Sequence, residues 1–155
     1  TQVVPAFSGL LRDNRMTGTI NDLVGDLNGA RSAAIRYGEQ VVVCKSADGA
    51  SCTNAGRWDQ GWLVFVDSDR DRDVDGTEAR LRSGRPPADG PTVSYSAFPT
   101  DNYVLYYPSG LTRGNGTFTF CDTRGAADAK AVILAKAGRL QVSRAAADGS
   151  ALTCP

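Results

Sequence analysis

Apolar side chains recur at spacings of three and four between residues 20 and 37, which predicts an amphipathic helix over this stretch. The positions on this stripe are Ile20, Leu23, Val24, Leu27, Ala30, Ala34 and Ile35. Arg36 falls in the last predicted turn and Gly38 just beyond it, and both residue types are favourable at a helix C-terminus. We therefore expect the helix to end there.

A second apolar stripe precedes the first and consists of Val4, Phe7, Leu10 and Leu11. If residues 4–37 form one helix, it is roughly 50 Å long at 1.5 Å per residue. A globular chain of this length has a diameter of about 40 Å. The first part of such a helix would overhang the body and present apolar side chains to a partner.

The rest of the chain alternates short β-branched and aromatic runs with turn residues, which predicts strands. The expected strands cover residues 40–44, 61–67, 80–83, 92–96, 103–107, 117–121, 131–134 and 140–143. A helix followed by a run of strands implies an α+β fold with the helix packed on antiparallel sheet. We expect one domain, in which residues 1–18 are the outer part of the helix, 19–38 pack on the sheet and 39–155 are mainly β.

Composition limits the chemistry. The 155 residues contain 17 basic and 17 acidic side chains and no histidine. Balanced charge gives no global attraction to nucleic acid or to an anionic membrane. Without histidine, the chain cannot form Ser–His–Asp or Cys–His sites. No other nucleophile or carboxylate pair has a recognisable setting, so we expect neither an enzyme nor a cofactor.

The four cysteines are scattered, which favours disulfides over a zinc site. Four cysteines allow three pairings. We favour Cys44–Cys52, because a turn-rich loop joins them, together with Cys121–Cys154, which would fix the C-terminus. The alternative is four reduced, buried thiols.

An acidic stretch follows the second predicted strand. Asp71, Asp73, Asp75 and Gly76 match the opening of a calcium loop, D-x-D-x-D-G. The twelfth position from Asp71, where such a loop needs glutamate, is Arg82. We therefore favour a solvated turn with local Asp–Arg pairs over a metal site.

The last third of the chain is richer in basic residues. Arg113, Lys136, Arg139 and Arg144 are the candidates for a phosphate-binding surface. The alternative, which this composition favours, is an ordinary solvated face of a sheet.

Several motifs together resemble the type IV minor pilins and pseudopilins of the GspH/FimT/FimU group, with FimU-like minor pilins the nearest. In order along the chain, the matching residues are Pro5 and Phe7, Asn14-Arg15, 21–23 (NDL), 30–35 (ARSAAI), 58–67 (WDQGWLVFVD) and Leu81-Arg82. This set covers about half of the chain.

The resemblance implies a pilin fold and a structural role. The subunit would help to start pilus assembly at the bacterial inner membrane, facing the periplasm, and would then sit in the extracellular fibre near its tip. Its partners would be other minor pilins and the major pilin, contacted through the N-terminal helix. The resemblance also implies a leader and an apolar membrane segment before Thr1, since no run of eighteen apolar residues occurs in this chain.

Two other functions stay open within this group: a type II secretion minor pseudopilin, and a DNA-binding pilin of natural transformation. The DNA-binding branch carries a C-terminal G-R-x-R motif. Here Gly138-Arg139 match the motif, but Gln141 stands where the second arginine would be. That departure argues against DNA uptake.

Overall fold

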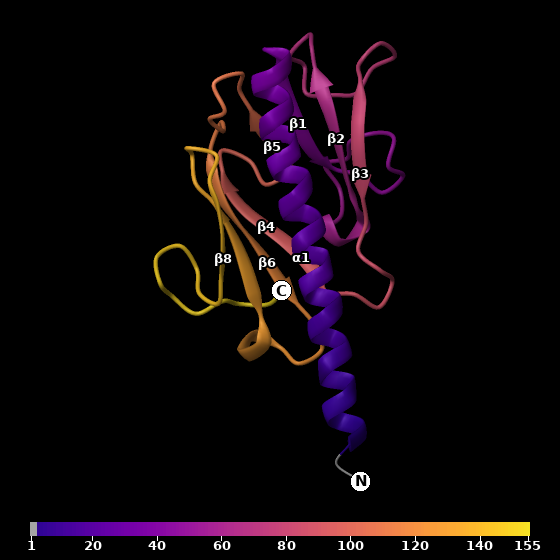
Figure 1. Ribbon diagram of the computed structural model, residues 1–155, viewed down its shortest axis with the longest axis vertical. Coiled ribbons are helices and arrows are strands. Elements are labelled where there is room, and N and C mark those ends of the chain that lie inside the picture. The colour runs from indigo at the N-terminus through magenta and orange to yellow at the C-terminus, as the bar shows by residue number, and fades with distance from the viewer. Residues whose placement is uncertain (1–2) are drawn as a thin grey trace.

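The computed structural model describes residues 3–155, and its main feature is a single long helix, α1 (Val3–Tyr37), packed on two antiparallel sheets (Figure 1). The first sheet has the strand order β3-β2-β1-β5 and the second the order β4-β6-β7-β8. The strands are β1 (Gln40–Lys45), β2 (Trp62–Asp67), β3 (Arg80–Gly84), β4 (Thr92–Phe98), β5 (Tyr103–Tyr106), β6 (Asn115–Cys121), β7 (Lys130–Leu134) and β8 (Leu140–Ser143). Two short 3₁₀ turns, η1 (Trp58–Gln60) and η2 (Ala126–Asp128), lie in the connections.

The predicted strands are confirmed to within two residues at each end, and the α+β pilin-like class is confirmed. The antiparallel strands are divided between two sheets. The loop between β3 and β4 contains Pro86, Pro87 and Pro91, which have no backbone N–H to donate to a ladder. The chain therefore leaves the first sheet after β3 and begins the second with β4.

α1 is one continuous helix that ends where the sequence predicts. Gly38 adopts a φ of 67°, and its N–H donates to the carbonyl of Ala34 at 3.0 Å. A left-handed residue at this position is typical of a helix C-terminus and favours glycine. No helix within residues 3–155 has an apolar stretch that could cross a membrane.

The buried face of α1 is rotated from the predicted stripe. Ile20, Leu23 and Leu27 are buried as expected, whereas Val24 is only half-buried and Ile35 is 54% exposed. At 100° per residue, Val24 and Ile35 lie at one edge of the stripe, about 60–80° from Leu27. The opposite edge is buried instead, through Thr19, Asp26 and Ala33.

Burial along α1 begins at Met16, which is completely buried, slightly before the predicted boundary at residue 19. Thr1 and Gln2, part of the expected outer segment, lie outside the described residues.

Strands β1 and β2 of the first sheet are buried on both faces. Val41, Val43 and Val64 face the core beneath α1, while Val42 and Phe65 point to a second cluster on the other side. Loop residues cover this second cluster, including Val74 from the acidic stretch and Cys52. Because both faces are covered, β1 and β2 read as continuous apolar runs.

The second sheet completes the core with alternating side chains. Phe118 and Phe120 are fully buried and the threonines beside them are not, as the alternation in β6 predicts. Trp58 packs edge-on against Tyr95 and Phe118 with ring centroids 5.6 and 5.0 Å away.

Two disulfides join Cys44 to Cys52 and Cys121 to Cys154, the two pairs that the sequence favours. The first fastens the loop after β1 over the second core cluster, and the second fastens the C-terminal tail to the end of β6.

Candidate functional site

The N-terminal part of α1 projects beyond the sheets, as Figure 1 shows. Val4, Phe7 and Leu10 are 76%, 60% and 56% exposed, and Leu11 is also exposed. These four residues are the first of the two stripes predicted from the sequence, and we call them the projecting stripe. An exposed apolar group of this kind indicates a surface that another molecule covers.

The helix is held to the body where the projection begins. Arg124, just after β6, donates to Asp13 of α1 at 2.9 Å and to Asp122 at 2.6 Å. The hydrogen bonds from Arg124 lower the pKa of the Asp122 carboxyl below its usual range. Arg15, two residues further along α1, pairs with Asp89 at 2.6 Å. Together these pairs set the angle at which α1 leaves the body.

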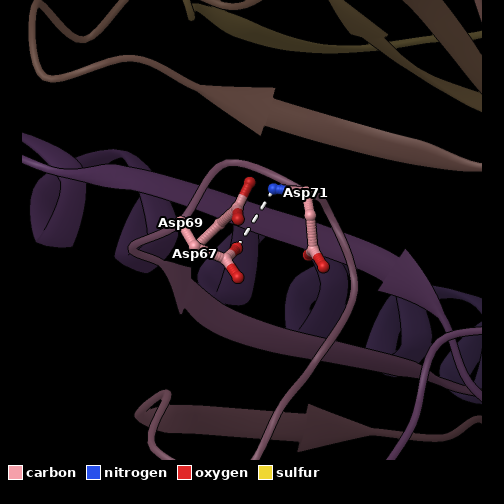
Figure 2. Close-up of side chains that lie close together, drawn as sticks. All are labelled: Asp67, Asp69 and Asp71. Carbon is pink, nitrogen blue, oxygen red and sulfur yellow. Dashed lines mark hydrogen bonds between the residues drawn. The ribbon is translucent and has the colours of Figure 1, made fainter.

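The acidic loop between β2 and β3 gathers three carboxylates. Asp67, Asp69 and Asp71 each offer an oxygen, and these atoms lie within 4.8 Å of one another (Figure 2). The backbone N–H of Asp71 donates to Asp69 at 3.2 Å, and that of Arg72 donates to Asp67 Oδ1 at 3.3 Å. The loop backbone therefore turns its N–H groups toward the carboxylates.

The structure differs from the expected candidate site in this loop. It brings Asp71 together with Asp67 and Asp69, whereas Asp73 and Asp75 lie outside the cluster. The sequence carries a signal for the clustered set, because counting from Asp67 instead of Asp71 places Glu78 at the twelfth position.

The expected local Asp–Arg pairs are also wrong. Over residues 3–155, no ion pair joins Arg70 or Arg72 to a carboxylate. Both arginines are exposed at positive φ, and the Arg72 guanidinium lies 6.0 Å from the centre of the Tyr103 ring. Backbone N–H groups, and not the arginine side chains, donate to the carboxylates of this loop.

Glu78 is the sixth acid of the loop and is buried at its base. Its carboxylate accepts from the N–H of Ser68 at 2.7 Å and from that of Asp75 at 3.4 Å. Burial raises the pKa values of both Asp67 and Glu78, which also repel each other. The loop thus concentrates negative charge that its own arginines do not neutralise.

The basic candidates are divided between two places. Arg113 lies beside Thr112, whose N–H donates to the carbonyl of Lys136 at 2.9 Å, so these two loops adjoin. Arg139 lies in the same β7–β8 turn as Lys136, and all three cations are exposed. Arg144 follows the other end of β8, roughly 16 Å further along the strand. The structure therefore places Arg113, Lys136 and Arg139 on adjoining loops and Arg144 apart from them.

The sequence profile of one protein family, described as Type II transport protein GspH, matches residues 19–138. The chain belongs to the GspH family. This family comprises minor pilins and pseudopilins, in agreement with the resemblance noted in the sequence. A search of curated proteins finds no match.

Two solved structures share the fold of this GspH-family chain, and both are the type IV minor pilin FimU of Pseudomonas aeruginosa strain PAO1. The crystal form in space group P21 matches with a TM-score of 0.62 and 19% sequence identity, covering 84% of this chain and 90% of FimU. The form in space group P65 gives a TM-score of 0.58 and 16% identity, covering 83% and 92%. At these identities the similarity establishes the fold alone.

Proposed function

We propose that this chain is a structural minor pilin that helps to initiate type IV pilus assembly and is incorporated in the fibre near its tip. The observation that carries this proposal is the projecting stripe, Val4, Phe7, Leu10 and Leu11, which is exposed on a helix otherwise packed on the sheets. Family membership supports the same function. The role is structural, without catalysis.

The projecting stripe would contact the helices of other minor pilins and of the major pilin. Before assembly the subunit would reside at the inner membrane and face the periplasm, and after assembly it would lie in the extracellular fibre. A helix that presents apolar positions at i, i+3 and i+4 packs on a similar helix by interdigitation of side chains.

A matched pair of double variants tests this assembly surface. Phe7→Ser/Leu10→Ser removes two apolar side chains from the projecting stripe. Phe98→Ser/Leu111→Ser removes the same two side-chain types from exposed positions elsewhere, where they are 81% and 47% exposed. Both variants should unfold close to the wild-type temperature, because exposed substitutions change stability little.

The readout is pilus number on cells that carry each variant in place of the native gene, together with crosslinking to the major pilin. We expect cells with the Phe7/Leu10 variant to lose both the pili and the crosslink to the major pilin. Cells with the Phe98/Leu111 variant should keep the pili and the crosslink. Normal piliation with the first variant would contradict the proposal. Loss of secretion instead of pili would indicate a type II secretion pseudopilin.

DNA binding is a second candidate function, favoured by the grouping of Arg113, Lys136 and Arg139 on adjoining loops. Exposed cations of this kind bind phosphates without sequence preference, with affinity that falls as salt rises. Lys136→Gln/Arg139→Gln should then weaken binding in gel shifts, and Arg144→Gln, at the other end of β8, should leave it nearly unchanged. Absence of salt-sensitive binding at micromolar protein would exclude this function.

A further inference from the structure

One buried oxygen in the acidic loop has no partner. Asp67 is 1% exposed, and its Oδ2 accepts no hydrogen bond from any residue between 3 and 155. Its carboxylate lies among those of Asp69 and Asp71, as the close-up in Figure 2 shows. A buried, unpartnered carboxylate oxygen is unfavourable unless a cation or a donor compensates it.

The loop also follows the pattern of a twelve-residue calcium loop when it is counted from Asp67. Such a loop uses side chains at positions one, three and five, a backbone carbonyl at seven and a glutamate at twelve, with a left-handed residue at six. Asp67, Asp69 and Asp71 occupy positions one, three and five, and Glu78 occupies the twelfth. Arg72, at the sixth, has a φ of 68°.

We propose that residues 67–78 form a calcium site in which Asp67, Asp69 and Asp71 supply carboxylate ligands. Hard oxygen donors on an exposed, irregular loop suit Ca²⁺, which accepts six to eight oxygens in flexible geometry. Mg²⁺ demands a regular octahedron and gives up its water reluctantly, so it fits this loop less well. Bound calcium also offsets the charge of the buried Asp67 and Glu78.

Calcium at this site also orders the part of the loop that covers the second core cluster. Val74, in the middle of the loop, packs on the second core cluster together with Cys52 and Tyr103. Fixing the loop between Asp71 and Glu78 therefore holds Val74 in place over the first sheet. Binding should accordingly raise the thermal stability of the whole domain.

The test combines thermal melts and titration calorimetry of the purified chain with calcium chloride and with magnesium chloride. For a Kd of about 0.1–1 mM, we expect about 10 mM calcium to raise the Tm by roughly 3–10 °C. Magnesium should give little or no rise. No calcium-dependent shift, or an equal shift with magnesium, would overturn the proposal.

Two single variants of equal charge locate the site. Asp71→Asn removes a proposed ligand and should weaken calcium binding by about tenfold or more, because ligand charge sets the affinity of such loops. Asp73→Asn, two residues away, changes a side chain outside the cluster and should leave the affinity within about twofold of wild type, since position seven binds through its carbonyl. Equal effects of the two variants would mean diffuse attraction to an acidic loop and would overturn the site. Both aspartates are exposed, so neither substitution threatens folding.

Discussion

At the scale of single residues, Asp26 shows how a charged side chain can belong to the core. It lies on α1, only 8% exposed, and its Oδ2 accepts from the indole Nε1 of Trp62 at 2.7 Å. Arg82 from β3 pairs with its other oxygen at 3.3 Å. A buried carboxylate is tolerated when donors satisfy it. Trp62 and Arg82 therefore position α1 on the first sheet.

The two tryptophans allow a matched test of this interaction. Trp58 and Trp62 are both fully buried, but Trp58 donates to the backbone carbonyl of Asp101 at 3.0 Å, whereas Trp62 donates to a carboxylate. A hydrogen bond to a charged group contributes about 1.5–3 kcal/mol and one to a neutral group about 0.5–1.5 kcal/mol. Trp62→Phe should therefore lower the free energy of unfolding by about 1–2 kcal/mol more than Trp58→Phe, measured by urea denaturation. Equal losses would mean that lost volume, and not the carboxylate, determines the cost.

At the scale of elements, the sequence predicts α1 and the strands well, because their periodicity is local. The sequence pattern misplaces the buried face of α1, because it counts every apolar residue equally and does not show which of them the sheets contact. Asp26 looks like a solvent-facing position until Trp62, 36 residues later, is placed beside it. Ile35 looks like core, yet its side chain is 54% exposed.

The sequence pattern also missed which carboxylates of the acidic loop lie together, for a related reason. Asp67 ends an apolar strand, so it reads as the last residue of β2 and not as the first residue of a loop. Starting the count at Asp71 then puts Arg82 where a glutamate is needed. Only the fold shows that Asp67 belongs to both elements and that its carboxylate lies beside Asp69 and Asp71. The grouping of Arg113 with Lys136 likewise depends on contacts between distant loops.

At the scale of the whole molecule, one junction joins α1 to the second sheet and to the C-terminal tail. Near the point where α1 leaves the body, Arg124 links Asp13 of the helix to Asp122 at the end of β6. Asp122 is also next to Cys121, whose disulfide holds the C-terminal tail. Helix, second sheet and tail therefore meet around one guanidinium group.

This junction should make stability sensitive to acid. The hydrogen bonds from Arg124 lower the pKa of Asp122 in the folded state, whereas in the unfolded chain it returns to about 3.9. The unfolded state therefore binds the proton first, so the stabilisation from Asp122 is complete above about pH 5 and is lost as the pH falls through 4 toward the folded pKa.

We expect the free energy of unfolding of wild type, measured by urea denaturation from pH 7 to pH 3, to fall more steeply below pH 4 than that of Asp122→Asn. Asp22, which is exposed on α1 and forms no ion pair or side-chain hydrogen bond with residues 3–155, is the control, and Asp22→Asn should nearly retain the wild-type slope. Parallel curves for wild type and Asp122→Asn would show that the junction around Arg124 does not hold α1 to the second sheet.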